Sequence, residues 1–137
     1  MTEAAVHVKT ADRPGGRVAT VIIDNRRRLN CLASPTIIRL TQAFRTLSED
    51  PALRAVILTG AGDKAFIGGA DLRELGACDA DAVRLFITRL HQACLAIREC
   101  PVPVIGRVNG FCLGAGLEVA ASCDMRVSSD NAIYGMP

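Results

Sequence analysis

The sequence predicts an α/β or α+β fold with a buried sheet, and three observations lead to that prediction. Two strand-like stretches near the N-terminus are followed by alternating strand and helix patterns, the order expected when helices cover a sheet. Half of the residues are hydrophobic, and 137 residues are enough for one domain with a real core. Only 4% are aromatic, so Val, Ile, Leu and Ala must fill that core.

The first stretch predicts an antiparallel pair of strands. Residues 7–10 and 18–23 alternate or run apolar, and the Pro-Gly-Gly of residues 14–16 lies between them as a turn. Residues 24–28 are polar and end in three arginines, so a loop is expected to follow the second strand.

A helix and a third strand are expected next. Ser34 is the predicted N-cap and Pro35 the first helical residue, because apolar residues then recur at helical spacing. The Asp-Pro of residues 50–51 ends this helix, since the residue before proline disfavours helical geometry. Residues 54–59 contain Ala-Val-Ile-Leu, which is typical of a short buried strand.

Two glycine-rich bends follow that strand. Residues 60–65 superficially match the dinucleotide-binding pattern G-x-G-x-x-A, but no helix is expected to open there. Residues 68–72 contain a second bend close behind the first. This spacing favours either exposed backbone beside a ligand or an irregular loop.

A long helix is expected after Asp79, which can cap it, because apolar residues recur at helical spacing as far as Ile97. His91 lies next to that apolar stripe, and a helical histidine of this kind is more often packed or solvated than catalytic. Pro101 and Pro103 end the helix and lead into another apolar strand.

The chain between Asn109 and Glu118 combines a strand end, a glycine-rich turn and the start of a helix. A helix N-terminus offers free N–H groups and partial positive charge, which suit a phosphate, a carboxylate or a developing oxyanion. Glu118, in the first helical turn, is an acid/base candidate. The alternative is purely structural, because glycines often serve helix packing and first-turn glutamates are common. No Lys-Ser/Thr follows the last glycine, which excludes a P-loop.

Residues 124–128 and 132–134 are expected to form two short strands.

Composition and cysteine spacing exclude several classes of protein. A net charge of +2 is too small to indicate nucleic-acid binding, and no apolar run is long enough for a membrane span. The N-terminus lacks the pattern of a signal peptide. None of the six cysteines are spaced C-x-x-C, so neither a zinc site nor a disulfide framework is expected. Buried free thiols and a cytoplasmic location are the predictions.

Three segments together resemble the crotonase family, also called the enoyl-CoA hydratase/isomerase superfamily. The first is residues 25–32, Asn-Arg-Arg-Arg-Leu-Asn-Cys-Leu, and the second is residues 58–72, which end in Lys-Ala-Phe-Ile-Gly-Gly-Ala-Asp-Leu. The third is residues 103–118, followed by Cys-Asp at 123–124 and Tyr-Gly-Met-Pro at 134–137. The resemblance covers essentially the whole chain in the family's order and spacing.

This resemblance implies a spiral of ββα units, of which residues 1–137 form the N-terminal core part. It implies that the chain stops before the family's C-terminal helices and is the N-terminal half of a longer polypeptide. It also implies an acyl-CoA substrate and a homotrimer or dimer of trimers at full length. No metal, no nucleic-acid or membrane partner, and no cofactor beyond the coenzyme A of the substrate are expected.

The resemblance further implies an oxyanion hole made of the backbone amides of Ala70 and Ala115. Two fixed N–H donors stabilise the negative charge that develops on a thioester carbonyl more than they stabilise the substrate. Family members often have glycine at the position of Ala115, a change that a backbone donor tolerates. The segment 68–72 is expected to receive the adenine of coenzyme A. Substrate contacts are implied for Arg28, Gly68, Gly69, Ala70, Asp71, Leu72, Arg73 and Ala115.

The charged residues near these segments allow two interpretations. Arg26, Arg27 and Lys64, like Arg28 and Arg73, either meet the phosphates of coenzyme A or form an ordinary solvated face. Two aspartates recur in the family pattern, each after a bend or helix end, and we interpret them as structural: Asp71 and Asp124.

Glu118 matches the first of the two glutamates of family hydratases, and the second would follow the Gly-Met-Pro at residues 135–137. The leading hypothesis is therefore an enoyl-CoA hydratase-like lyase, with this chain alone expected to be inactive. An enoyl-CoA isomerase is the nearest alternative, although simple isomerases often lack a glutamate at this position. A non-catalytic protein that binds coenzyme A or another partner is the alternative from a different class.

Overall fold

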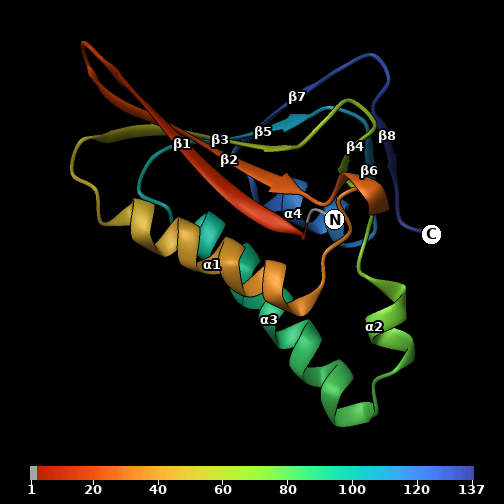
Figure 1. Ribbon diagram of the computed structural model, residues 1–137. Helices are drawn as coiled ribbons and strands as arrows, with labels where there is room; N and C mark the ends of the chain where they lie inside the picture. Colours follow the sequence, from red (N-terminus) through yellow and green to blue (C-terminus); the bar gives the residue numbers. More distant parts are fainter. Residues whose placement is uncertain (1–2) are drawn as a thin grey trace.

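The computed structural model describes residues 3–137, which form two β-sheets with helices packed beneath them (Figure 1). The larger sheet has the strand order β1-β2-β3-β5-β7, and the smaller one has the order β4-β6-β8. The predicted mixed architecture with a buried sheet is therefore confirmed. No helix in the described part of the chain is long and apolar enough to cross a membrane.

The larger sheet begins with the antiparallel hairpin that the sequence predicts. Strands β1 (Ala5–Arg13) and β2 (Gly16–Asp24) are longer than expected, and the hairpin extends away from the body of the molecule (Figure 1). The other three strands run parallel to β2: β3 (Leu53–Gly60), β5 (Val104–Val108) and β7 (Met125–Ser128).

The smaller sheet consists of three parallel strands of three residues each: β4 (Ala65–Ile67), β6 (Phe111–Leu113) and β8 (Ile133–Gly135). Each one follows a strand of the larger sheet along the chain, so β3–β4, β5–β6 and β7–β8 are equivalent pairs. Helices follow the first two of these pairs. The chain thus repeats a ββα unit, and the bends between its two strands stack at one end of the molecule.

Four α-helices lie in the described chain: α1 (Ser34–Ser48), α2 (Leu72–Gly76), α3 (Ala80–Arg98) and α4 (Ala115–Ser122). The two long helices, α1 and α3, pack side by side under the larger sheet (Figure 1). Their apolar stripes include Phe44 of α1 and Phe86 of α3, both fully buried against strand residues such as Val21. This burial encloses one core of aliphatic side chains, as the composition predicts.

Some local predictions were wrong. Ala33 is the N-cap of α1 and Ser34 its first residue, because the Ser34 side chain and amide are engaged by Glu74. Helix α2 was not predicted, since five residues cannot show a helical period. The polar loop after β2 contains a 3₁₀ turn, Arg26–Arg28, followed by Leu29 and Asn30 in the left-handed region.

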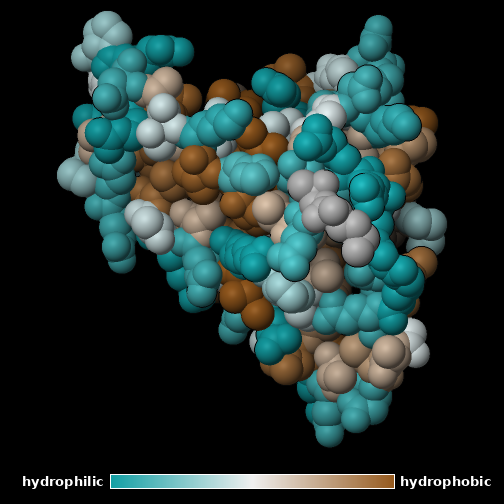
Figure 2. Space-filling view, viewed as in Figure 1, coloured by the Kyte–Doolittle hydropathy of each residue, from teal (hydrophilic) through white to brown (hydrophobic). Residues whose placement is uncertain are grey.

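One face of the molecule carries an apolar hollow between β1 and α1. Figure 2 shows hydrophobic residues gathered there among hydrophilic neighbours. Val6 and Val8 of the strand and Leu47 of the helix line a space of about 350 Å³. The hollow contains neither Glu118 nor the two glycine-rich bends, so it is separate from the candidate site residues.

Two asparagines fix the bend between β3 and β4. The Asn30 side chain donates to the carbonyls of Ala61 and Ala65 at 3.0 and 2.9 Å, and its oxygen accepts from the Asn25 amide at 2.8 Å. Asn109 donates from the other side to the carbonyls of Gly60 and Gly62 at 2.7 and 2.8 Å. These bonds satisfy backbone groups that no strand pairs, so the bend holds one conformation.

We predict that Asn30→Ala lowers the free energy of unfolding by about 3 kcal/mol, because it leaves buried backbone groups without partners. Urea denaturation measures this loss. Asn131→Ala is the matched control, since Asn131 donates at 2.9 Å to the Asp63 carbonyl but is exposed. It should cost about 1 kcal/mol or less. Equal losses in the two variants would contradict the role given to Asn30.

Candidate active site

The glycine-rich bend at residues 68–72 meets the glycine-rich turn before α4 at the end of the smaller sheet. A Cβ added to Gly116 would lie 2.1 Å from the carbonyl oxygen of Ile67, a distance that no side chain tolerates. A Cβ on Gly69 would lie 3.7 Å from the carbonyl oxygen of Leu113. Segments 67–70 and 113–116 are therefore in direct backbone contact, although they are far apart in the sequence.

The amide of Ala70 points away from its neighbouring strand. Ala70 forms a parallel bridge with Leu32, in which the Leu32 amide donates to Gly69 and the Asp71 amide donates to Leu32, both at 2.8 Å. In this pattern the groups of the bridged residue itself face the other side. Among the described residues, the Ala70 N–H has no backbone acceptor.

The amide of Ala115 is likewise available. Ala115 is the first residue of α4, and the N-cap residue before it, Gly114, has a φ of +54° that favours glycine. The first helical bond, at 3.2 Å, runs from the Glu118 amide to the Gly114 carbonyl, so the Ala115 N–H lies outside the helix ladder. The residue is buried, and its N–H adds to the positive end of the helix dipole.

The chain therefore brings two unpaired N–H donors into adjoining segments. Ala70 follows Gly69, which lies against the Leu113 carbonyl, and Ala115 lies two residues beyond Leu113. Unpaired amides at a helix start favour an anion or an oxygen that acquires negative charge. Such an arrangement can bind a carboxylate or phosphate, or polarise a carbonyl.

The segment that follows Ala70 is anchored at both ends. Asp71 caps α2 by accepting from the amides of Arg73 and Glu74, and it faces Arg28 at 3.7 Å. Glu74 accepts from the backbone amide of Ser34 at 2.8 Å and from the Ser34 hydroxyl. A carboxylate from α2 thus caps the N-terminus of α1 and fixes α2 to it.

Glu118 lies in a different part of this region, on the face of α4 that is turned toward α3. It borders a hollow of about 390 Å³ between the two helices. Three of the lining residues are apolar and four are polar or titratable: Ile87, Leu90, Ala121, and His91, Cys94, Glu118, Ser122. The structure therefore places an acid/base candidate beside a hollow of mixed apolar and polar lining, about one helical turn from Ala115.

Burial raises the pKa of three thiols in this part of the molecule, of which Cys94 lines the hollow. Burial raises the pKa of Cys94, the negative charge of Glu118 raises it further, and the nearby Ser122 hydroxyl lowers it. Burial raises the pKa of Cys112 to about 11 and that of Cys123 to about 12. All six cysteines are free, and the described residues contain no group of ligands arranged for a metal ion.

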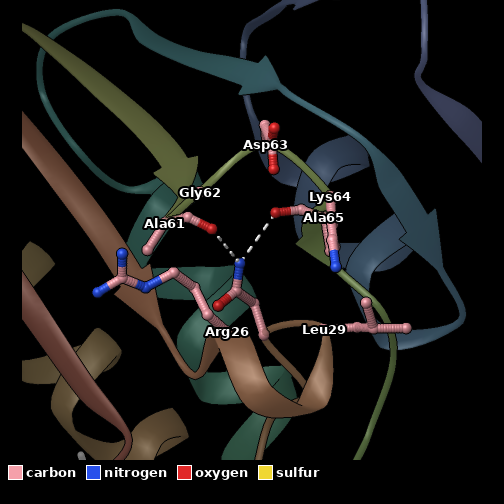
Figure 3. A pocket seen from close by; sticks show the side chains of 8 residues that line it. Arg26, Leu29, Ala61, Gly62, Asp63, Lys64 and Ala65 are labelled. Atoms are coloured by element: carbon pink, nitrogen blue, oxygen red, sulfur yellow. Dashed lines mark hydrogen bonds between the residues drawn. The ribbon is translucent and has the colours of Figure 1, made fainter.

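A second hollow, of about 160 Å³, lies at the bend between β3 and β4 (Figure 3). Arg26 and Lys64 line it, and the dashed lines mark the bonds of Asn30 to Ala61 and Ala65. The Arg26 guanidinium turns outward and pairs with Asp24 at 3.1 Å. Neither Glu118 nor the two amides lie here, so the cations at this bend are separate from the candidate acid/base group.

The predicted site residues divide into two groups in space. Residues 68–73 and Arg28 come together around the Ala70 bend, which adjoins Ala115, while Glu118 faces the hollow on α3. Asp124 accepts from the Val104 amide at 2.7 Å, which confirms its structural reading. Sequence reasoning missed Glu74, although an Asp followed three residues later by a Glu is the spacing of a helix start.

Comparisons with known proteins point to one family. Residues 14–137 match the family profile described as Enoyl-CoA hydratase/isomerase. The chain is 39% identical over 122 residues to a short-chain-enoyl-CoA hydratase of Clostridium acetobutylicum, covering 89% of this chain and 47% of that protein. It is 35% identical over 121 residues to a crotonyl-CoA hydratase of Syntrophomonas wolfei, with coverages of 88% and 46%. The chain spans about half the length of the curated relatives that it matches.

Solved structures give the same result. A protein of Magnetospirillum magneticum described as an enoyl-CoA hydratase/carnithine racemase superposes with a TM-score of 0.88 at 35% identity. The match covers 98% of this chain and 51% of that one. An enoyl-CoA hydratase of Bacillus anthracis also has a TM-score of 0.88, at 31% identity, with coverages of 96% and 50%. The repeated ββα arrangement is thus the fold of these proteins.

We predict that Glu74→Ala releases α2 from the start of α1. The free energy of unfolding should fall by about 1–2 kcal/mol, because two bonds at a helix N-terminus are lost. Amide hydrogen exchange over residues 71–76 should quicken more than exchange in β3. Glu49→Ala, an exposed change at the other end of α1, is the control and should alter neither quantity. Unchanged exchange over residues 71–76 would rule out the anchoring role.

Proposed function

The chain belongs to the enoyl-CoA hydratase/isomerase family, and from this membership we propose that it binds an acyl-CoA thioester for the addition of water to a 2-enoyl-CoA. Membership rests on the family match over residues 14–137 and on relatives of 39% and 35% identity. The observation that carries the proposal is the pair of unpaired amides, Ala70 and Ala115, on backbone segments in direct contact.

The two amides serve as an oxyanion hole for the thioester carbonyl. During hydration, electron density moves from the double bond onto the carbonyl oxygen, which becomes an enolate oxygen. Fixed N–H donors stabilise that oxygen more than the neutral carbonyl, and one such donor typically lowers the barrier by about 3 kcal/mol. The close approach of Gly116 to the Ile67 carbonyl supports this role, because it fixes the start of α4 before the substrate arrives.

Coenzyme A occupies the surface beside the Ala70 bend. Gly68, Gly69 and Leu72 give it backbone and apolar contact, while Arg28 and Arg73 supply positive charge for its phosphates. Arg28 already faces Asp71 at 3.7 Å, and Arg73 is exposed on α2. Arg28 is therefore partly neutralised, which makes Arg73 the better phosphate contact of the two. The mechanism needs no cofactor beyond the coenzyme A of the substrate.

Glu118 handles a proton in this reaction. Hydration joins the oxygen of water to the β-carbon and a proton to the α-carbon, so one group must accept the proton that water loses. Glu118 faces the hollow between α3 and α4, whose apolar lining residues Ile87, Leu90 and Ala121 suit an acyl chain. This location, one helical turn from Ala115, supports its assignment as the base.

An isomerase is the second candidate function. Moving a double bond requires only that one group carry a proton between two carbons, and Glu118 is the only carboxylate that lines this hollow in the described chain. Activity toward a 3-enoyl-CoA, with none toward crotonyl-CoA, would decide for this candidate. Binding of both without turnover would decide for a non-catalytic protein that binds coenzyme A.

The proposal extends to assembly and compartment. Apolar side chains at the open edges of both sheets are exposed, which supports association with further protein, in the homotrimer or dimer of trimers that the family resemblance implies. These residues are Met125, Val127, Ile133 and Tyr134. The free thiols support a reducing compartment such as the cytoplasm.

We predict that Ala115→Pro abolishes the polarisation of a bound thioester. Proline is tolerated at the first helical position, so the variant should fold while lacking one N–H donor. The infrared carbonyl stretch of bound butyryl-CoA should return toward its value in solution. Ala115→Ser keeps the donor and is the control. A carbonyl stretch that is equally shifted in both variants would show that Ala115 is not a donor to the thioester.

We predict that Glu118→Gln slows hydration by at least about 100-fold, because the amide keeps the shape of the side chain and loses its basicity. The loss of absorbance of crotonyl-CoA measures the rate in the protein that carries this chain. Glu99→Gln, an exposed change at the end of α3, is the control and should leave the rate unchanged. A normal kcat in Glu118→Gln would exclude the proposed role.

A further inference from the structure

A hollow of about 420 Å³ lies on the face of the larger sheet that is turned away from α1 and α3 (Figure 1). In β2, Val21 is buried on the side of the helices, so the next residue, Ile22, faces the opposite side and lines the hollow. The parallel strands β2, β3 and β5 all end beside this hollow. Crevices at the carboxyl ends of parallel strands are frequent ligand sites.

The strand register brings side chains from four strands into one row of this hollow. Ile22 of β2 lies opposite His7 of β1 on one side and opposite Thr59 of β3 on the other. Thr59 in turn lies opposite Arg107 of β5. Lys9 is two residues from His7 on β1, so its side chain is on the same face of the sheet. All five residues line the hollow.

The one carboxylate that lines the hollow, that of Asp24, already has two partners. Its oxygens accept from Arg26 at 3.1 and 3.3 Å, and one of them lies 3.4 Å from the His7 ring. Lys9 and Arg107 are left over, because neither side chain forms an ion pair within residues 3–137.

The strands beside these two cations do not neutralise them. Charged residues in a sheet are stabilised when a residue of opposite charge faces them across the strands. Arg107 instead has Thr59 and Val127 opposite it, and the residue opposite Lys9 is Thr20. Both charged side chains are exposed. Two positive charges therefore border one hollow without a carboxylate that is free to pair with them.

We propose that this hollow binds the phosphate group of a small phosphorylated molecule, at a site separate from that of the acyl-CoA thioester. A phosphate monoester carries nearly two negative charges at pH 7, which matches two unpaired cations better than the single charge of a carboxylate. The guanidinium fork of Arg107 suits two phosphate oxygens, and Lys9 supplies a point charge. Ile22 gives the carbon part of the ester an apolar surface to contact.

The hollow is distinct from the candidate active site. It contains neither Glu118 nor the amides of Ala70 and Ala115, and the two arginines assigned to coenzyme A, Arg28 and Arg73, do not line it. Two unpaired cations are also too few for a nucleic acid, whose binding depends on contacts to many phosphates. The inference thus goes beyond the proposed function and does not depend on it.

Methyl nuclear magnetic resonance of the protein that carries this chain tests binding, with phenyl phosphate as the probe. The phenyl ring should shift the methyl signals of Ile22 and leave those of Ile37, which is buried beneath the sheet, unchanged. Phenyl sulfate has the same shape but one negative charge, so it should bind at least about 10-fold more weakly. Ile22 signals that phenyl phosphate does not move, or equal affinities for the two probes, would overturn the proposal.

Substitution of the two cations tests the assignment of the residues. Arg107→Gln and Lys9→Gln should each weaken the binding of phenyl phosphate by about 10-fold or more, because each removes a charge-assisted contact. Arg13→Gln is the matched control, since Arg13 is an exposed residue of β1 that does not line the hollow. All three side chains are exposed, so the variants should keep the fold. Equal affinities in the three variants would contradict the assignment.

Butyryl-CoA separates this inference from the proposed function. A saturating amount of butyryl-CoA should leave the shift that phenyl phosphate causes at Ile22 intact. Displacement of phenyl phosphate would assign the hollow to the coenzyme A site and overturn the claim of a separate one. Failure of butyryl-CoA to bind would contradict the proposed function, while the shift at Ile22 would still decide for or against the phosphate site.

Discussion

The contact between Gly116 and the carbonyl of Ile67 is the constraint on which the candidate site depends. With only 2.1 Å available to a Cβ, helix α4 can start against the end of β4 only because this residue is glycine. That closeness sets Ala115 beside the bend that carries Ala70. A larger residue would push the two segments apart. The ligand would then have to hold the amides of Ala70 and Ala115 in position. Part of the free energy of binding would be lost in fixing them.

Repetition of the ββα unit explains why such a contact arises at all. Strands β3, β5 and β7 are each followed by a short strand of the smaller sheet, and β4, β6 and β8 run parallel, so the segments that follow β4 and β6 lie side by side. The bend between β3 and β4 is held by the side chains of Asn30 and Asn109, and the end of β6 is closed by the bond from the Gly114 amide to the Gly135 carbonyl at 2.9 Å. Because equivalent segments of successive ββα units lie side by side, residues far apart in the sequence come together without a long connecting loop.

Much of this arrangement was predictable from the sequence, and the failures have physical causes. The hairpin, α1, α3, α4 and the strands of the larger sheet were predicted from helical spacing, apolar runs and turn residues, and the family resemblance supplied the positions of Ala70 and Ala115 and the role of Glu118. Strands β4 and β6 were missed because each has only three residues and adjoins a glycine-rich bend or turn, with which it was interpreted. The bond from Glu74 to Ser34 links residues forty positions apart, which no local pattern encodes. His91 was interpreted as an ordinary helical residue, since only the packing of α3 on α4 shows that it shares a hollow with Glu118.

The buried thiols affect how readily the protein's own cysteines would react with the proposed substrate. A 2-enoyl thioester is an electrophile that thiolates attack at the β-carbon, so a protein that handles the proposed substrate risks alkylating its own cysteines. Cys94 borders the space where such an acyl chain would lie, but burial and the charge of Glu118 raise its pKa and keep it in the unreactive thiol form. Burial raises the pKa of two further thiols, that of Cys112 to about 11 and that of Cys123 to about 12. Burial is thus the main cause that keeps these thiols from competing with water for the proposed substrate.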